Sequence, residues 1–354
     1  MRRTRSFTVL MVISMILLAA CGGGNPADVG DGGDGGGDDI QVGVAFDIGG
    51  RGDQSFNDAA YRGLQTAIDE GFVPEENTEF IEPNASGSNR DDNVVNFADQ
   101  GYDLVIAVGF AFSEGIDEIA GDYPDTRFAV VDGFAQEAKN VTNLTFREQE
   151  GSFLVGAAAG LKTQANTVGF LGGQEGTGLI ERFEAGYTAG VQEVNPDAEV
   201  LVEYIGSGTA AFNDPTKGEA LSDKMYDAGA DVVYHAAGAS GAGLFKASAE
   251  AQQYSIGVDS DQSLTASAEQ RRWILTSMLK RVDVAVHDTI EQVSNDEFTS
   301  GTQVFGLKED GVGYAVNKYN DNERLLSQDI QSELEKLKEA IVGGEITVPS
   351  EPEG

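Results

Sequence analysis

The chain has almost none of the residues from which disulfides and metal sites are built. Among 354 residues there is one cysteine, and the two histidines are His235 and His287. A single cysteine excludes a disulfide within the chain, and no Cys/His cluster offers the ligands of a zinc site. The aspartates are too scattered for a calcium-binding EF-hand loop. We therefore expect neither a metal nor a cofactor.

Basic residues are also scarce, with 23 Lys and Arg against 59 Asp and Glu, a formal net charge of −36. A field of that sign repels nucleic acid and anionic lipid headgroups, which excludes both as partners. Eighteen Phe and ten Tyr argue against a disordered acidic chain. Such charge is tolerable where the Debye length is about 3 Å, at roughly 1 M salt. The composition therefore predicts a halophilic source.

No segment approaches the roughly 18 apolar residues of a transmembrane helix. The N-terminus instead has three early arginines, an apolar run from Phe7 to Leu18, and then Ala19-Ala20-Cys21. This order predicts a signal peptide over residues 1–20. Leu18–Cys21 resembles a lipobox, in which Cys21 becomes the lipidated first residue; the alternative is an ordinary signal peptide with a chance cysteine. The Arg2-Arg3 pair leaves general and twin-arginine export both open.

Both ends of the chain outside the predicted lobes have a biased composition. After Cys21, the segment up to residue 39 is almost entirely glycine and aspartate, which predicts a flexible tether between a lipid anchor and the folded part. At the other end, residues 327–354 predict one amphipathic helix over Ser327–Val342, followed by an acidic tail that contains proline.

Short apolar runs alternate with helix-length segments between these ends. Runs without polar alternation are typical of strands buried on both faces, so they predict an α/β fold with parallel sheets. The predicted strands are Val42–Phe46, Leu104–Val108, Phe128–Val131, Val168–Leu171, Val200–Val202, Val232–Tyr234 and Ile256–Val258. The predicted helices include Asp58–Glu70, Ser113–Ala120, Ile180–Val194, Lys217–Ala228 and Gly243–Gln253.

The strands form two groups, one before and one after residue 150, which predicts two similar doubly wound lobes. We assign residues 40–148 and about 281–300 to the first lobe, and residues 149–280 and about 301–326 to the second. Glu150–Lys162 is rich in glycine and alanine, so we place this helix at the junction of the lobes, where close packing is needed.

Polar and aromatic residues follow nearly every predicted strand. In open α/β sheets, ligands bind at the carboxyl ends of the strands. One aspartate after a strand is more often a helix cap than a ligand contact, but the repetition across both lobes favours a binding cleft. The positions concerned are Asp47–Asn57, Phe110, Phe112, Asp132-Gly133, Gly172-Gly173, Arg182-Phe183, Phe212–Pro215, Gly238–Gly243 and Asp259–Asp261.

An ordered series of motifs resembles the basic membrane protein family of purine nucleoside receptor lipoproteins over about residues 41–320. The opening motif is Asp47-x-Gly49-Gly50-x-x-Asp53-x-Ser55-Phe56-Asn57, with Gly63 six residues further on. The rest of the series comprises Val131-Asp132, Arg182–Gly186, Phe212-Asn213-Asp214-Pro215-x-Lys217-Gly218, His235–Gly238 with Gly241, Gly257–Gln262 and Ser277–Asp283.

The resemblance implies a type I periplasmic-binding-protein fold, in which two doubly wound parallel-sheet lobes are joined by a hinge and hold a purine nucleoside. It implies that Phe56 and Phe212 sandwich the base, and that Asn57 and Asp132 bond its polar edge. The ribose would be surrounded by Asp47, Gly238, Asp259 and Lys280. The resemblance also implies an ABC permease as partner and an extracytoplasmic location on the cell membrane, held by the lipid on Cys21.

Several alternatives stay open at this point. Phe56 and Phe212 could be core residues, and Lys280 could pair with Asp283 on a solvated helix face. The ligand could be a sugar or another small polar molecule, and the protein could be a sensor without an importer. An enzyme is disfavoured, because no nucleophile is spaced beside His235 and no Gly-x-Gly-x-x-Gly follows the first strand. We therefore predict no catalytic residues.

Overall fold

The computed structural model describes residues 40–352. The predicted signal peptide, Cys21 and the Gly/Asp tether lie outside the described residues. Within residues 40–352, no helix is both long enough and apolar enough to cross a membrane. The described chain contains two six-stranded sheets, and the predicted α/β architecture with two lobes is confirmed.

The first sheet has all its strands parallel, and its order is β11-β5-β4-β3-β1-β2. Its central strands are buried along their whole length because helices cover both faces, which explains their continuous apolar sequences. In chain order the strands are β1 Val42–Ala45, β2 Thr78–Ile81, β3 Leu104–Val108, β4 Arg127–Val131, β5 Val141–Phe146 and β11 Gly301–Phe305.

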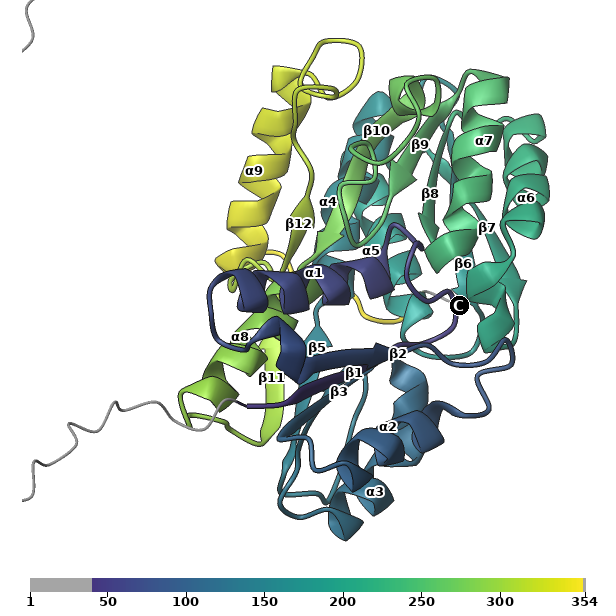
Figure 1. The fold of residues 1–354 in the computed structure, drawn as a ribbon. Coiled ribbons are helices and arrows are strands. Elements are labelled where there is room, and N and C mark those ends of the chain that lie inside the picture. The colour runs from purple at the N-terminus through teal and green to yellow at the C-terminus, as the bar shows by residue number, and fades with distance from the viewer. Residues whose placement is uncertain (1–39, 353–354) are drawn as a thin grey trace, which may run out of the picture. The chain divides into compact units, whose positions relative to one another are not determined.

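The second sheet has the order β12-β10-β9-β8-β6-β7 (Figure 1). It is parallel except that β12 runs antiparallel to β10. Its strands are β6 Thr167–Gln174, β7 Glu199–Gly206, β8 Val232–Ala236, β9 Tyr254–Gly257, β10 Ile274–Lys280 and β12 Val312–Tyr314.

The helices associate with one lobe or the other. Helix α1 packs on α8 in the first lobe, where the absence of a side chain at Gly63 lets the helix approach the backbone of Asp283. The first lobe has α1 Phe56–Asp69, α2 Arg90–Asp99, α3 Ile116–Asp122 and α8 Val282–Ser294. The second has α4 Glu148–Lys162, α5 Ile180–Val194, α6 Pro215–Asp227, α7 Gly241–Ala251 and α9 Gln328–Val342.

Two of these helices form where the sequence predicts them, although α4 packs within the second lobe rather than between the lobes. The glycine- and alanine-rich α4 packs tightly on α5, and Gly156 lies so close to the carbonyl of Tyr187 that a Cβ would not fit. The amphipathic α9 buries Leu334 and Leu337 and lies beside β12 (Figure 1), where Tyr314 donates a hydrogen bond of 2.6 Å to Glu335.

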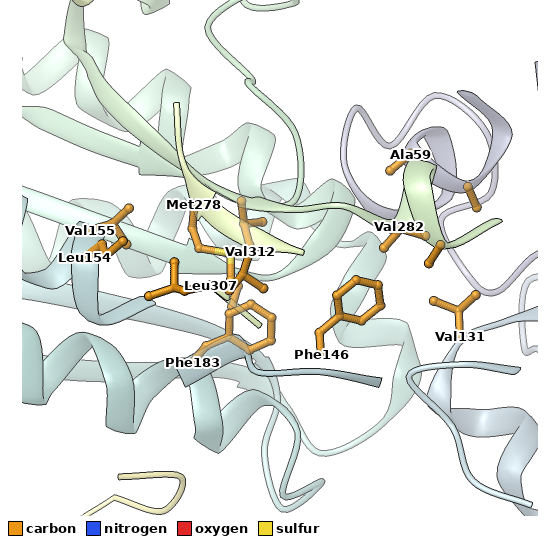
Figure 2. Packing of buried hydrophobic residues seen from close by; sticks show 14 of the residues in the cluster. Ala59, Val131, Phe146, Leu154, Val155, Phe183, Met278, Val282, Leu307 and Val312 are labelled. Carbon is orange, nitrogen blue, oxygen red and sulfur yellow. The ribbon is translucent and has the colours of Figure 1, made fainter. Parts of the chain in front are cut away.

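Three segments cross between the lobes, and backbone hydrogen bonds tie them together. The first leads from β5 to α4, the second from β10 to α8, and the third from β11 to β12. Arg147 N donates to Phe305 O at 3.0 Å, and Arg281 N donates to Gly311 O at 2.8 Å. Around them one apolar cluster continues from lobe to lobe, including Phe146, Phe183, Val282, Leu307 and Val312 (Figure 2).

The predicted assignment of residues 301–305 to the second lobe is wrong. This strand, β11, pairs in parallel with β5 at the edge of the first sheet. The chain therefore crosses back after residue 305 rather than near residue 300. The short run of β11 is half-exposed and contains polar residues, so its sequence carries no signal of a buried strand.

Candidate functional site

All eight residues that the family resemblance singled out line one cavity. The first lobe contributes Asp47, Phe56, Asn57 and Asp132, and the second contributes Phe212, Gly238, Asp259 and Lys280. The cavity encloses about 590 Å³ of space between atoms, counted together with its open mouth. The sheets therefore bring strand ends from both lobes to one shared cavity.

Phenylalanine side chains form much of the apolar wall. Phe56 and Phe212 are joined there by Phe110 and Phe183. Phe110, two residues after the last residue of β3, meets Phe212 across the lobes with ring centroids 6.3 Å apart in an edge-to-face arrangement. Phe112, which followed the same strand in the sequence, is instead buried in the core of the first lobe. The sequence named both phenylalanines, but only the structure separates the wall residue from the core residue.

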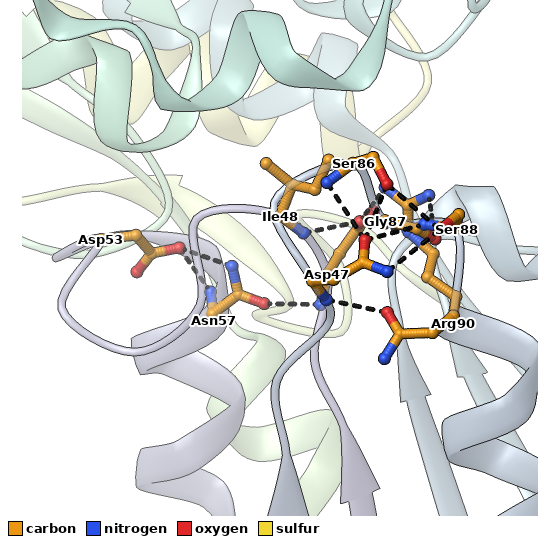
Figure 3. Close-up of polar contacts among 10 residues, drawn as sticks. Asp47, Ile48, Asp53, Asn57, Ser86, Gly87, Ser88 and Arg90 are labelled. Carbon is orange, nitrogen blue, oxygen red and sulfur yellow. Dashed lines mark hydrogen bonds and ion pairs between the residues drawn. The ribbon is translucent and has the colours of Figure 1, made fainter.

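Asn57 links two buried aspartates on the first-lobe side of the cavity (Figure 3). Its Oδ1 accepts a hydrogen bond of 3.2 Å from Asp47 N, and its Nδ2 donates one of 3.0 Å to Asp53. Asp53 also accepts from the backbone N–H groups of Ser55, Asn57 and Asp58. Asp53 therefore caps the N-terminus of α1. Burial raises the pKa of the Asp53 carboxyl to about 6, although these backbone donors lower it.

Arg90, at the start of α2, is a site residue that sequence reasoning missed. It forms an ion pair with Asp47, and its Nε donates a hydrogen bond of 2.5 Å to Asp47 Oδ1. Burial raises the pKa of Asp47, and the charge of Arg90 opposes that shift. Gly109, with a φ of +133°, makes room for this carboxylate, because a Cβ at this position would lie only 2.7 Å from Asp47 Oδ2. No local motif marks Arg90, because it reaches Asp47 from 43 residues along the chain.

Lys280 lies at the end of β10, not on a helix, and is only 1% exposed. Its Nζ lies 2.6 Å from Oδ2 of Asp132 and 3.0 Å from Oε1 of Glu148. The rings of Phe56, Phe146 and Phe183 surround the ammonium at about 5 Å. Burial disfavours the charged form, but Asp132, Glu148 and Asp259 together raise the pKa of Lys280. The alternative pairing with Asp283 is wrong, because Asp283 pairs with Arg281.

Asp132 and Asp259 face Lys280 from different lobes. Burial raises the pKa of Asp132 to about 7; Lys280 opposes the shift, and Glu148 adds to it. Burial likewise raises the pKa of Asp259, whose Oδ2 accepts a hydrogen bond from Ser55 Oγ across the lobes. The Oδ1 atom of Asp132 is buried and has no hydrogen-bond partner. Both aspartates have a positive φ, 61° and 63°, in the left-handed region that non-glycine residues seldom adopt.

The two histidines lie outside the cavity lining. His235 is fully buried, and burial lowers its pKa to about 4, so the ring is neutral. Its Nε2 lies 2.9 Å from the Gln262 side chain. His287, Asp288 and Glu291 gather their ligand atoms within 4.8 Å, but His287 already bonds to Asp288 and Glu70. These contacts explain the group as a surface ion-pair network.

The family of ABC transporter substrate-binding proteins described as PnrA-like matches residues 40–352, which is the whole of the described chain. The chain belongs to this family. It is therefore an ABC transporter substrate-binding protein, and its family is one of solute-binding proteins rather than enzymes. The sequence resemblance to the basic membrane proteins is confirmed.

Relatives of the family span nearly the whole chain. The "CD4+ T-cell-stimulating antigen" of Listeria innocua is 36% identical and covers 99% of both chains. The "ABC transporter nucleoside-binding protein BmpA" of Lactococcus lactis is 33% identical over 88% of this chain and 90% of its own. Among solved structures, an ABC transporter solute-binding protein from Aeropyrum pernix is 31% identical, with a TM-score of 0.78 over 89% of this chain and 94% of its own. The fold is thus that of the family's type I periplasmic binding proteins.

Proposed function

We propose that this family member captures a purine nucleoside between its lobes and delivers it to an ABC permease. The observation that carries the proposal is the composition of the cavity wall, which combines four phenylalanines with buried aspartates and a single lysine. Flat apolar surfaces suit a base, and carboxylates suit the hydroxyl and ring N–H donors of a nucleoside. A relative of 33% identity is named a nucleoside-binding protein, which agrees with this chemistry.

The base would lie between Phe56 and Phe212, which come from opposite lobes. Stacking on aromatic side chains contributes roughly 1–3 kcal/mol per base and tolerates different bases. Asp132 would accept a hydrogen bond from the polar edge of the base, because its Oδ1 is buried beside the cavity without a partner. Asn57 retains one unused N–H on its amide, since only one donor contact to Asp53 is formed.

The ribose would lie among Asp47, Gly238, Asp259 and Lys280, where carboxylate oxygens accept from hydroxyl groups. The same carboxylates argue against a nucleotide, since a phosphate would be repelled by several buried acids. The one lysine of the cavity is already engaged by Asp132 and Glu148. We therefore favour nucleoside over nucleotide.

Capture would proceed by closure of the lobes, and the ligand would favour the closed state by contacting both of them. Hydrogen bonds of the closed cleft would include one from Gln262 Nε2 to Gln54 O, at 3.2 Å, and one from Arg62 to Ser260 Oγ, at 2.6 Å.

We further propose that a lipid on Cys21 anchors the protein to the extracytoplasmic face of the membrane, where the permease receives the closed form.

Calorimetric titration in molar KCl tests the ligand class. Guanosine, inosine or adenosine should bind and raise the melting temperature, whereas free ribose and the corresponding monophosphates should not. Stabilisation by ribose or another sugar, without any response to nucleosides, would favour the sugar-binding alternative and overturn the purine assignment.

Metabolic labelling with a radioactive fatty acid tests the proposed lipid anchor. The anchor would be refuted if the Cys21→Ser protein incorporated as much label as the wild type.

A further inference from the structure

The ligand cavity and the crossover segments meet at one buried carboxylate, that of Glu148. Glu148 is the first residue of α4, directly after the first crossover, and is 1% exposed. Its partner Lys280 ends β10 and leads into the second crossover. The same ammonium reaches Asp132, which follows β4 of the first lobe. One lysine therefore joins the first lobe, the crossover helix and the second lobe.

Three carboxylates share one buried ammonium at this junction. Asp132, Glu148 and Asp259 all act on the single ammonium of Lys280. Arg182 faces Glu148 from α5, with a nitrogen–oxygen distance of 3.6 Å, and Arg62 acts on Asp259 from α1. The Oε2 atom of Glu148 has no hydrogen-bond partner. The Lys280 ammonium is therefore shared by all three acids, whereas Arg182 and Arg62 each act on only one of them.

We propose that Glu148 is a positioning residue for ligand capture, which holds the Lys280 ammonium at the cavity wall and couples lobe closure to the first crossover. The inference rests on the proposed function, since it assumes that Asp132 and Lys280 contact the ligand. Glu148 does not line the cavity itself, so it acts through Lys280. Because Lys280 is shared, any change at Glu148 is transmitted to Asp132.

Glu150 provides a matched control within the same helical turn. It is a buried glutamate, 8% exposed, and its Oε2 accepts a hydrogen bond of 2.8 Å from Leu307 N in the third crossover. Its other partner is Arg147, at 3.0 Å. Glu150 thus links crossover segments as Glu148 does, but its contacts do not include the cavity lysine. A purely structural role for Glu148 would make the two residues equivalent.

Glu148→Gln removes the charge and keeps the shape. An amide oxygen is a weaker acceptor from an ammonium than a carboxylate, so we expect the affinity for inosine at pH 8 to fall roughly fivefold or more. The negative charge of Glu148 also raises the pKa of Asp132. Without it, Asp132 should stay ionised to lower pH, and the midpoint of the affinity profile should shift to lower pH.

The experiment is calorimetric titration of the full-length protein with inosine from pH 5.5 to 8.5 in molar KCl, where buried pairs are little screened. Glu148→Gln should lower both affinity and midpoint, whereas Glu150→Gln should keep the wild-type midpoint even if it lowers the melting temperature. Glu148→Asp keeps the charge but withdraws the carboxylate, so it should weaken binding with a smaller shift of the midpoint.

The inference is overturned if Glu148→Gln leaves affinity and midpoint unchanged, or if Glu150→Gln shifts the midpoint as far. Should Glu148→Gln fail to fold, the comparison of Glu148→Asp with Glu150→Asp decides in the same way, because only the former should weaken inosine binding. A wild-type protein that binds no nucleoside would overturn the proposed function and this inference with it. That outcome can be distinguished from failure of the Glu148 inference alone, because it is observed with the wild-type protein before any variant is measured.

Discussion

The guanidinium of Arg90, which is not part of the cavity lining, lies against the carboxylate of Asp47, which is; both side chains are only 12% exposed. Arg90 is the first residue of α2, and Asp47 lies in the loop that follows β1. The ion pair therefore ties this loop to a neighbouring helix. The backbone N–H of Ile48 donates to the same Asp47 oxygen, at 2.6 Å. Asp47 is therefore held in one orientation before any ligand arrives.

Arg90→Ala should weaken nucleoside binding by roughly tenfold or more, because it leaves Asp47 as a buried carboxylate without its cation. Removing one partner of a buried pair typically costs about 3–5 kcal/mol. Calorimetric titration gives the affinity, and thermal unfolding gives the stability. Arg127→Ala is the matched control, since its partner Asp296 is 91% exposed and such pairs contribute about 0–1 kcal/mol. Equal effects of the two variants would contradict the assignment of Arg90 to the site.

Phe212→Ala should weaken nucleoside binding by at least roughly tenfold through loss of one stacking face. Phe212→Tyr should retain most of the affinity, because the ring remains. Phe134→Ala serves as a control, as this side chain follows β4 but is 46% exposed. Affinity of Phe212→Ala equal to that of the wild type would remove Phe212 from the site.

Asp259→Ala should likewise weaken binding at least roughly tenfold, since both a ribose acceptor and the contact with Ser55 across the lobes are lost. Ser55→Ala removes only the contact across the lobes and should have a smaller effect on affinity. If the two variants bind equally well, the contribution of Asp259 lies in closure rather than in contact with the ligand.

The ligand-free protein should lose stability as the pH rises through about 7. The pKa of Asp132 is raised by burial to about 7, above its ordinary value, so protonation of this group stabilises the folded state. That contribution is present at low pH and is lost above the folded-state pKa. Asp132→Asn should therefore flatten the melting temperature between pH 5 and 8, whereas the exposed Asp125→Asn should follow the wild type. The prediction would be contradicted if the melting temperature of the wild type rose between pH 5 and 8 while that of Asp132→Asn stayed constant.

Binding should show the opposite dependence on pH. If ionised Asp132 accepts a hydrogen bond from the ligand, affinity for inosine should fall as the pH drops below about 7, the pKa of this group in the folded protein. Titration at constant salt over the same range measures this. A pH-independent affinity would exclude Asp132 as a charged acceptor.

Stability should increase with salt because the net charge is −36. The Debye length falls from about 10 Å at 0.1 M to about 3 Å at 1 M, which suppresses repulsion between surface carboxylates. We expect the melting temperature to rise over this range of KCl concentration. A melting temperature that is constant or decreases would contradict a surface adapted to high salt.

The sequence by itself determined the two-lobed α/β architecture, because strands buried on both faces of a parallel sheet read as continuous apolar runs. It also identified eight of the residues that line the cavity, since each stands in a family motif near the end of a strand or at the start of the segment that follows. Only the tertiary structure decided the roles of Arg90 and Glu148. Their partners lie on other segments, and an ion pair between distant segments leaves no periodicity or spacing in the chain. The same holds for β11, whose lobe was fixed by pairing with β5 rather than by its own half-exposed residues.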